Sequence, residues 1–285
     1  MGIVYACIAP HGAEIIPKLA GSQLEAFDKT RCGMERLAEQ MKKYDPTTIV
    51  IATPHGLRLT NSIGVVTSEY CAGNLQNNRK SIRLRLRCDR ELAFEILKKS
   101  NKTKLPIIGV NFGTDEGPAS SMPMDWGTLI PLWFLSQPQK NRKKPKIVVV
   151  TPSREIPLSD LVDFGKAIAN VVEKRNRKVA FVASADQGHA HDKSGPYGFN
   201  QASAKYDKLV LDAVKENNLK DLLSLNNKFL KDAKPDSLWQ IAILVGILDS
   251  IPMKGEIFSY QAPTYYGMLC AGFEPAKVQQ ISKNL

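Results

Sequence analysis

Short apolar runs alternate with longer segments of helical periodicity along the chain. The runs over residues 3–9, 48–53, 146–150 and 179–183 are rich in Val, Ile and Ala and carry no charge in their interiors. Such runs predict strands that are covered on both faces of a sheet. Residues 81–87 instead alternate Ile or Leu with Ser or Arg, a pattern typical of a strand with one solvated face.

Apolar positions three or four residues apart predict helices between these strands. The expected helices cover residues 22–44, 89–100, 160–173, 201–217 and 238–250, and two further strands are expected over residues 62–67 and 105–110. Asp89 stands where a helix N-cap is expected. Residues 113–125 and the Tyr-, Gly- and Pro-rich tail after residue 250 are expected to be irregular.

This alternation of strand and helix predicts an α/β fold with a central, mostly parallel or mixed sheet flanked by helices. No Gly/Ser-rich linker interrupts the 285 residues. We therefore expect a single domain over residues 1–285.

The net charge is +11, from 39 basic and 28 acidic residues. The basic residues are spread along the chain, and the dense run at residues 140–146 lies between apolar segments, as expected for a solvated loop. We therefore expect no nucleic-acid partner. A positive field would instead attract an anionic small substrate, such as an aromatic carboxylate.

Five widely spaced cysteines form no C-x-x-C pair, which argues against a disulfide framework or a zinc ribbon and predicts a cytoplasmic location. The N-terminus lacks the basic and apolar segments of a signal peptide. No apolar stretch reaches the roughly 18 residues that would suggest a membrane span, so we expect no membrane partner.

All four histidines follow strand-like runs. His11 and His55 each end an apolar run in the pattern small residue, Pro, His, Gly, while His189 and His191 follow the run at residues 179–183. If the first two strands are parallel and close, both imidazoles project from the same carboxyl edge of the sheet, where α/β proteins build their sites. Because neutral imidazole is the commonest metal ligand in proteins, the pattern predicts a metal centre.

The third ligand stays open at this point. A carboxylate would complete a facial triad of two histidines and one acid, which leaves positions for substrate and O₂. Candidate carboxylates are Glu14, Asp115, Asp125, Asp186, Asp192 and Glu256. The His189–His191 pair is compatible with an active-site role or with one buried and one exposed histidine. The chain contains no HExxH, P-loop, GxGxxG or GxSxG motif.

Together these motifs resemble the class III extradiol ring-cleavage dioxygenases, the family of the catalytic subunit of protocatechuate 4,5-dioxygenase. The resemblance rests on strand-APHG, strand-TPHG and ASADQGHAH, and it extends in the family's order from residue 3 to about residue 270. Residues 125–132 (DWGTLIPL) resemble the family's DHG-x-x-x-PL segment, and residues 263–268 (PTYYGM) its C-terminal signature.

The resemblance implies a role for seven residues: His11, His55 and Glu256 as metal ligands, His189 as the acid–base residue, and His191, Trp126 and Tyr265 as substrate contacts. It implies an Fe(II) cofactor, with Mn(II) or Zn(II) as alternatives, at a site on one edge of the sheet. The implied reaction opens a catechol or 2-aminophenol-type ring with O₂. We further expect a homo-oligomer, with a small partner subunit as an additional possibility.

One residue departs from the family pattern. Trp126 stands where relatives carry the histidine of the DHG segment. A tryptophan could stack on an aromatic substrate, or it could mark a Memo-like binding or scaffolding protein that shares the fold without ring-cleaving activity. A zinc hydrolase that uses His189 and His191 is a further alternative, although no general-base Glu follows at a recognisable spacing.

Overall fold

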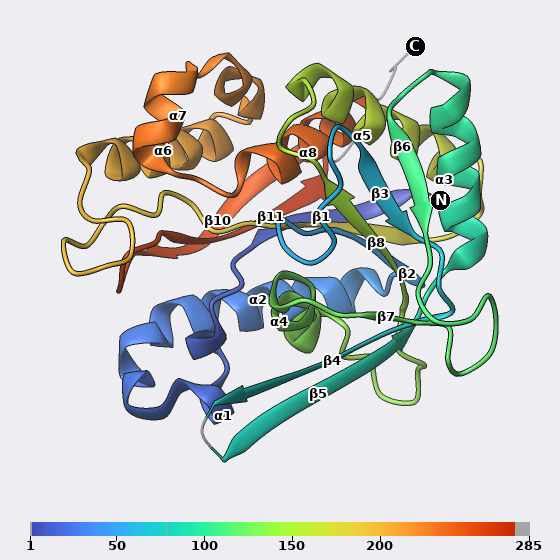
Figure 1. The fold of residues 1–285 in the computed structure, drawn as a ribbon, viewed down its shortest axis with the longest axis horizontal. Coiled ribbons are helices and arrows are strands. Elements are labelled where there is room, and N and C mark those ends of the chain that lie inside the picture. The colour runs from blue at the N-terminus through green and yellow to red at the C-terminus, as the bar shows by residue number, and fades with distance from the viewer. Residues whose placement is uncertain (1, 78, 277–285) are drawn as a thin grey trace, which may run out of the picture.

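Eight strands form one mixed sheet at the centre of the computed structural model, which describes residues 2–77 and 79–276. Their order across the sheet is β10-β11-β1-β9-β2-β8-β3-β6 (Figure 1). The bounds are β1 Ile3–Ala9, β2 Thr48–Ala52, β3 Ile63–Val66, β6 Ile107–Val110, β8 Lys146–Pro152, β9 Val179–Ser184, β10 Met253–Gln261 and β11 Met268–Pro275. A separate three-stranded sheet has the order β5-β4-β7 and consists of β4 Tyr70–Asn77, β5 Lys80–Arg87 and β7 Ser121–Pro123.

Four neighbouring strands at the centre of the large sheet, β1, β9, β2 and β8, run parallel. On one side β11 pairs antiparallel with β1, and on the other side β3 pairs antiparallel with β8. The predicted mostly parallel or mixed sheet is therefore confirmed. Because parallel neighbours end at the same edge, the loops that follow these four strands meet there.

Helices cover both faces of the large sheet (Figure 1). The α-helices of the described residues are α1 Pro17–Ala20, α2 Asp28–Tyr44, α3 Arg90–Lys102, α4 Trp126–Leu135, α5 Leu158–Glu173, α6 Gln201–Lys215, α7 Asn227–Ala233 and α8 Leu238–Ser250. Within the described residues, none of them is long and apolar enough to cross a membrane.

Alternation along the central strands divides the core into two layers, because successive side chains of a strand point to opposite faces. In β2, Val50 and Ala52 join the core that contains α3, α5 and α8. Ile49 and Ile51 join the core that contains α2, α4 and the small sheet. Burial on both faces explains why these strands are uncharged in the sequence.

Several elements agree closely with the sequence pattern. The strand at residues 3–9 and the helix at 238–250 have the predicted bounds. Asp89 caps α3 by accepting a hydrogen bond from the Leu92 amide. β5 buries alternate residues, as its pattern predicts.

The prediction of an irregular C-terminal tail was wrong. β10 and β11 form an antiparallel pair there, and β11 pairs with β1 at the other end of the chain. β10 is an edge strand with mostly half-exposed side chains, so its hydrophobic alternation is weak. The pairing of β11 joins residues far apart in sequence, and local periodicity does not report such contacts.

Candidate metal centre and active site

The parallel strands β1, β9 and β2 end at one level and carry the histidines to one edge. The register pairs Ala9 with Ser184 and Ala52 with Ala183. His11 and His55 follow the two outer strands, and their Nε2 atoms lie 3.1 Å apart. The expectation that the two imidazoles share one carboxyl edge is therefore confirmed.

A carboxylate that the sequence analysis missed joins this pair. Asp236 lies just before α8, and its Oδ2 atom is 3.2 Å from His11 Nε2 and 3.5 Å from His55 Nε2. Its side chain is buried, and within the described chain no donor reaches Oδ2 with hydrogen-bond geometry. The other oxygen, Oδ1, accepts a hydrogen bond from the Asp186 amide at 2.9 Å, which fixes the carboxylate with Oδ2 facing the imidazoles.

These three atoms fit a metal ion. They lie 3.1–3.5 Å from one another, and ligands with metal bonds of about 2.0–2.2 Å in tetrahedral or octahedral geometry are about 3.0–3.5 Å apart. Two imidazoles and one carboxylate are also the donor set of the facial triad. A buried carboxylate oxygen without a hydrogen-bond donor is the atom that a cation would satisfy.

The hydrogen bonds around His11 select its tautomer. The Ser184 hydroxyl donates to the Gly127 carbonyl at 2.5 Å, so its oxygen accepts the Nδ1–H of His11 at 3.1 Å. In the neutral ring, His11 Nε2 is then the atom with the free lone pair. This is the usual arrangement of a metal-binding histidine whose second nitrogen is held by a neighbour.

His189 has the same tautomer for a different reason. Its Nδ1 lies 2.7 Å from the Gln187 carbonyl, which only accepts, so Nδ1 carries the proton. His189 Nε2 lies 3.9 Å from Asp236 Oδ2. Burial lowers the pKa of His189, with a partly opposing effect from Asp236. The His189 ring therefore presents a neutral, proton-accepting nitrogen beside the triad of His11, His55 and Asp236.

Asp186, one of the candidate carboxylates, also contacts His11. Its Oδ1 accepts from the His11 amide at 3.1 Å, and its Oδ2 lies 3.2 Å from His11 Nε2. Burial and the nearby Asp236 charge raise the pKa of Asp186 to about 7. Burial by itself would lower the pKa of His11, but Asp186 and Asp236 outweigh that effect and raise it to about 9. The carboxylates thus make this buried site favourable for positive charge.

The first residues of α4 hold the loop that carries His55. Asp125 caps this helix by accepting from the Thr128 amide at 3.0 Å, and it also accepts from the Thr53 hydroxyl at 2.7 Å. These bonds tie the loop after β2 to the helix. Trp126, the first helical residue, packs on the His55 imidazole with ring centroids 4.1 Å apart and remains 47% exposed.

Aromatic side chains and the histidines line a cleft of about 310 Å³, called here the aromatic cleft. Its lining residues are His11, Gly12, Ala13, Glu14, His55, Trp126, Asp186, His189, Tyr197, Tyr265 and Tyr266. Tyr266 stacks on His189 with centroids 5.6 Å apart, and its hydroxyl donates to Glu14 at 3.2 Å. Trp126 and Tyr265, both expected to contact substrate, therefore lie in the wall of the cleft.

His191 lies elsewhere. Its Nε2 is 2.9 Å from Asp207 Oδ2, and this buried carboxylate also accepts from the Gly188 amide and the Tyr260 hydroxyl, each at 2.7 Å. The ring is directed at Asp207 and is not among the residues that line the cleft. The structure therefore places His191 against Asp207 in the loop after β9, and its contact with the substrate stays a prediction.

Glu256 does not lie with the histidines, which corrects its assignment as a ligand. It stands in the edge strand β10 opposite Gly272, and its two-thirds-exposed carboxylate pairs with Arg36 of α2 at 3.2 Å. Gly272 is in turn paired with Cys7 of β1, which precedes His11 by four residues. Glu256 therefore lies two strands away from β1, at a level four residues before His11. Asp236 takes the place expected for Glu256.

Asp236 gave little sequence signal because it does not follow a strand. It belongs to a Lys-Pro-Asp-Ser segment before an apolar helix, which is a usual helix start. The start of α8 brings it to the sheet edge. Its proximity to the expected helix was the one signal available.

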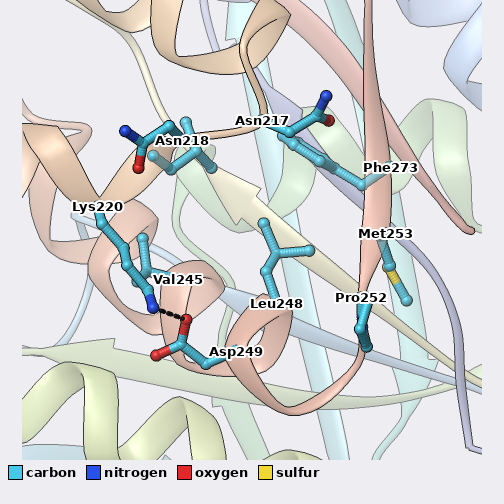
Figure 2. Close-up of a pocket in the computed structure, with 10 residues that line it drawn as sticks. Asn217, Asn218, Lys220, Val245, Leu248, Asp249, Pro252, Met253 and Phe273 are labelled. Carbon is cyan, nitrogen blue, oxygen red and sulfur yellow. Dashed lines mark ion pairs between the residues drawn. The ribbon is translucent and has the colours of Figure 1, made fainter.

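A different hollow lies at the opposite end of α8. Figure 2 shows this pocket of about 320 Å³, with Leu248 and Phe273 in its wall and an ion pair between Lys220 and Asp249 at 2.7 Å. The described residues that line it include no histidine. The His and Asp side chains that could hold a metal lie instead around Asp236, just before the start of α8.

Comparison with known proteins identifies the family of this chain. Residues 5–271 match the family described as the catalytic LigB subunit of aromatic ring-opening dioxygenase. Protein CA_C1420 of Clostridium acetobutylicum is 27% identical over 280 residues, which are 97% of this chain and 58% of that protein. The chain thus spans less than two thirds of this relative's length.

A solved structure shares the fold. The crystal structure of the uncharacterized protein JW3007 from Escherichia coli K12 superposes with a TM-score of 0.59, covering 94% of this chain and 99% of that one. Sequence identity is 14%, so this similarity concerns the fold alone.

Proposed function

The chain belongs to the family of LigB catalytic subunits of aromatic ring-opening dioxygenases, and we propose that it is a non-haem Fe(II)-dependent extradiol dioxygenase. Its substrate would be a catechol or a 2-aminophenol-type ring, opened with O₂. The observation that carries the proposal is the convergence of His11 Nε2, His55 Nε2 and Asp236 Oδ2 within 3.5 Å beside the aromatic cleft.

His11, His55 and Asp236 would hold the metal. Fe(II), when bound, would supply open positions for the ring oxygens and O₂ and would lower the pKa of the ring hydroxyls. Mn(II) and Zn(II) also accept imidazole or carboxylate donors, so the donor set alone does not distinguish these metals. The choice of Fe(II) comes from the family resemblance.

His189 would move the proton. Its Nδ1–H is held by the Gln187 carbonyl, its free Nε2 lies 3.9 Å from Asp236 Oδ2, and the ring lines the aromatic cleft. It would accept a proton from a ring hydroxyl and return it later to a product oxygen. An imidazole is suited to both transfers near neutral pH, because its ordinary pKa of about 6.5 lies close to the working range.

The aromatic cleft would orient the ring. Trp126, Tyr265 and Tyr266 offer aromatic surfaces, and stacked or edge-on ring contacts prefer centroid separations of about 4.5–7 Å. The same side chains would exclude water from the reacting face of the ring. Ser184 and Asp125 would keep His11 and the His55 loop in place through the bonds described above.

The test is anaerobic loading with Fe(II), followed by O₂ consumption and absorbance of ring-fission products with a panel of catechols and 2-aminophenols. We expect one O₂ consumed per ring opened. His189→Gln should retain iron by elemental analysis but lose about 10²–10⁴ of turnover, the usual contribution of a general acid–base group. His191→Gln is the matched control and should keep most of the turnover. Full iron loading without O₂ consumption on any substrate in the panel would contradict the proposal.

A second candidate is a Memo-like protein that binds a ligand without ring cleavage. It is favoured by Trp126, whose ring covers part of His55 where relatives carry a histidine. Such a protein would bind aromatic ligands in the cleft and consume no O₂. Restoring the family residue with Trp126→His separates the two candidates, because O₂ consumption that appears only in this variant would identify a binding protein.

A further inference from the structure

A second hollow adjoins the triad and carries a very different charge. This cationic cavity has a volume of about 510 Å³ and includes His55, His189, Asp236 and Tyr197 in its wall. Its basic residues are Arg58, Arg154, Lys231 and Lys234. His55, His189 and Tyr197 also line the aromatic cleft, so the two hollows meet at the candidate active site.

Three separate segments contribute the four cations. Arg58 follows β2 and Arg154 follows β8, two parallel neighbours whose register pairs Ala52 with Val150. Lys231 lies in α7, and Lys234 follows that helix. The basic residues are dispersed in the sequence, and the fold gathers these four at the same carboxyl edge as the triad.

Within the described part of the chain, no carboxylate pairs with these four cations. In residues 2–77 and 79–276, none of the four forms an ion pair within 4.0 Å. Among the described residues, Asp236 is the only acid in the wall, and it faces His11 and His55. The Arg154 guanidinium lies over the Trp239 ring at 4.7 Å, and Lys234 Nζ is 6.0 Å from the Tyr197 ring.

Like charges that face one space repel each other, and an anion between them relieves that repulsion. Desolvation and the neighbouring Arg58 both lower the pKa of Arg154, with a partly opposing effect from Asp236. The aromatic cleft has the opposite balance, because Glu14 and Asp186 line it.

We propose that the cationic cavity binds an oxyanion group of at least two negative charges on the substrate, while the aromatic ring of that substrate occupies the aromatic cleft. A phosphate monoester and a pair of carboxylates share this chemistry. Arginine matches such groups with its planar fork of N–H donors, and lysine adds point charges. A single carboxylate would leave most of the four cations without a partner.

This inference rests on the proposed function and narrows its substrate class. The difference in charge between the hollows would also orient the substrate. Its acidic end would avoid Glu14 and Asp186, and its ring would be directed to Trp126 and the tyrosines. The experiment therefore measures binding, which requires neither a bound metal nor turnover.

Calorimetric titration with phenyl phosphate, benzoate, phenol and inorganic phosphate tests the proposal. At pH 7.5 the first three probes carry about −2, −1 and 0 charge on the same ring. We expect phenyl phosphate to bind at least about tenfold more tightly than phenol or inorganic phosphate, and benzoate to bind with an affinity between those of phenyl phosphate and phenol. Added salt should weaken the binding of phenyl phosphate. The double variant Arg58→Gln/Arg154→Gln should bind phenyl phosphate about tenfold or more weakly than the wild type, whereas its affinity for phenol should fall by less than about twofold.

The control removes the same charge elsewhere. Arg83→Gln/Arg87→Gln lies on β5 of the small sheet and should leave phenyl phosphate binding unchanged. Lys231→Gln/Lys234→Gln is the second test pair if the arginine pair fails to fold by circular dichroism. Equal affinity for the four probes, or full phenyl phosphate affinity in both test pairs, would overturn the inference.

The two proposals fail in different ways. Iron-dependent O₂ consumption with neutral catechols, together with no preference for phenyl phosphate, would remove this inference and leave the proposed function intact. Charge-selective binding without metal or O₂ consumption would remove the proposed function and leave the cationic cavity as a binding site. Inorganic phosphate that binds as tightly as phenyl phosphate would contradict the assignment of the ring to the aromatic cleft.

Discussion

The aromatic cleft and the cationic cavity share His55, His189 and Tyr197 but present opposite chemistry. The cleft offers aromatic rings with two acids, whereas the cavity offers four cations and the one carboxylate of the triad. Loops after β1 and between β10 and β11 build much of the cleft. Loops after β2 and β8 and the α7 region build the cavity. In the proposed site, loops would recognise the substrate, while the groups proposed to hold the metal lie at the ends of strands and at the start of a helix.

The largest expected effect comes from Asp236, which belongs to both the triad and the cavity wall. Asp236→Ala should weaken metal binding by on the order of 100-fold or more, because His11 and His55 lose the carboxylate that completes the proposed ligand set. Competition with a chelator, followed by elemental analysis, measures this change. Asp236→Asn, which keeps the size of the side chain, guards against a folding defect.

Glu256→Ala is the matched control. Its carboxylate pairs with Arg36 on an exposed surface, so metal binding should stay at the wild-type level. If Glu256→Ala loses the metal and Asp236→Ala keeps it, the ligand set proposed here is wrong and the expectation from the family resemblance is right.

The next effect is the pH dependence of metal binding. In the metal-free protein the pKa of His11 is raised to about 9, so a metal must displace a proton from Nε2 at neutral pH. Affinity should therefore rise with pH by about tenfold per unit below about pH 9. The raised pKa of Asp186, about 7, adds to the rise in the same direction. Titrations at pH 6.5, 7.5 and 8.5 in a non-coordinating buffer measure the slope, and a flat or falling profile would contradict it.

The smallest effect concerns one wall of the aromatic cleft. Trp126→Ala should weaken binding of the neutral ring of phenol by about two- to tenfold, the range expected for one aromatic contact. Metal content and inorganic phosphate binding should not change. Phe94→Ala on α3 is a control of similar exposure, 49% against 47%. Calorimetry on both variants makes the comparison.

Combining Trp126→Ala with Arg58→Gln/Arg154→Gln sharpens the contrast between the two hollows. If the ring and the oxyanion bind in separate hollows, the losses in free energy of phenyl phosphate binding should add. A combined loss no larger than either separate loss would mean that both changes act on one shared contact.

The sequence alone predicted much of the sheet. The uncharged runs of β1, β2, β8 and β9 follow from burial on both faces, which is a local property of each strand. The Pro-His-Gly motif after β1 and β2 predicted a shared edge, because proline ends a strand and parallel strands finish together. α4 was not predicted, since its Gly127 and Pro131 weaken the helical pattern.

The burial of the central strands and the positions of His11, His55 and His189 after strand ends could thus be predicted from the sequence. The position of Asp236, and not Glu256, beside these histidines follows from the fold, since α8 starts at the sheet edge whereas β10 forms an outer strand. Only the fold gathers Arg58, Arg154, Lys231 and Lys234 into one cavity. The physical reason is the same in each case: periodicity and strand-end motifs report local burial, whereas the meeting of residues distant in sequence depends on strand order and helix placement.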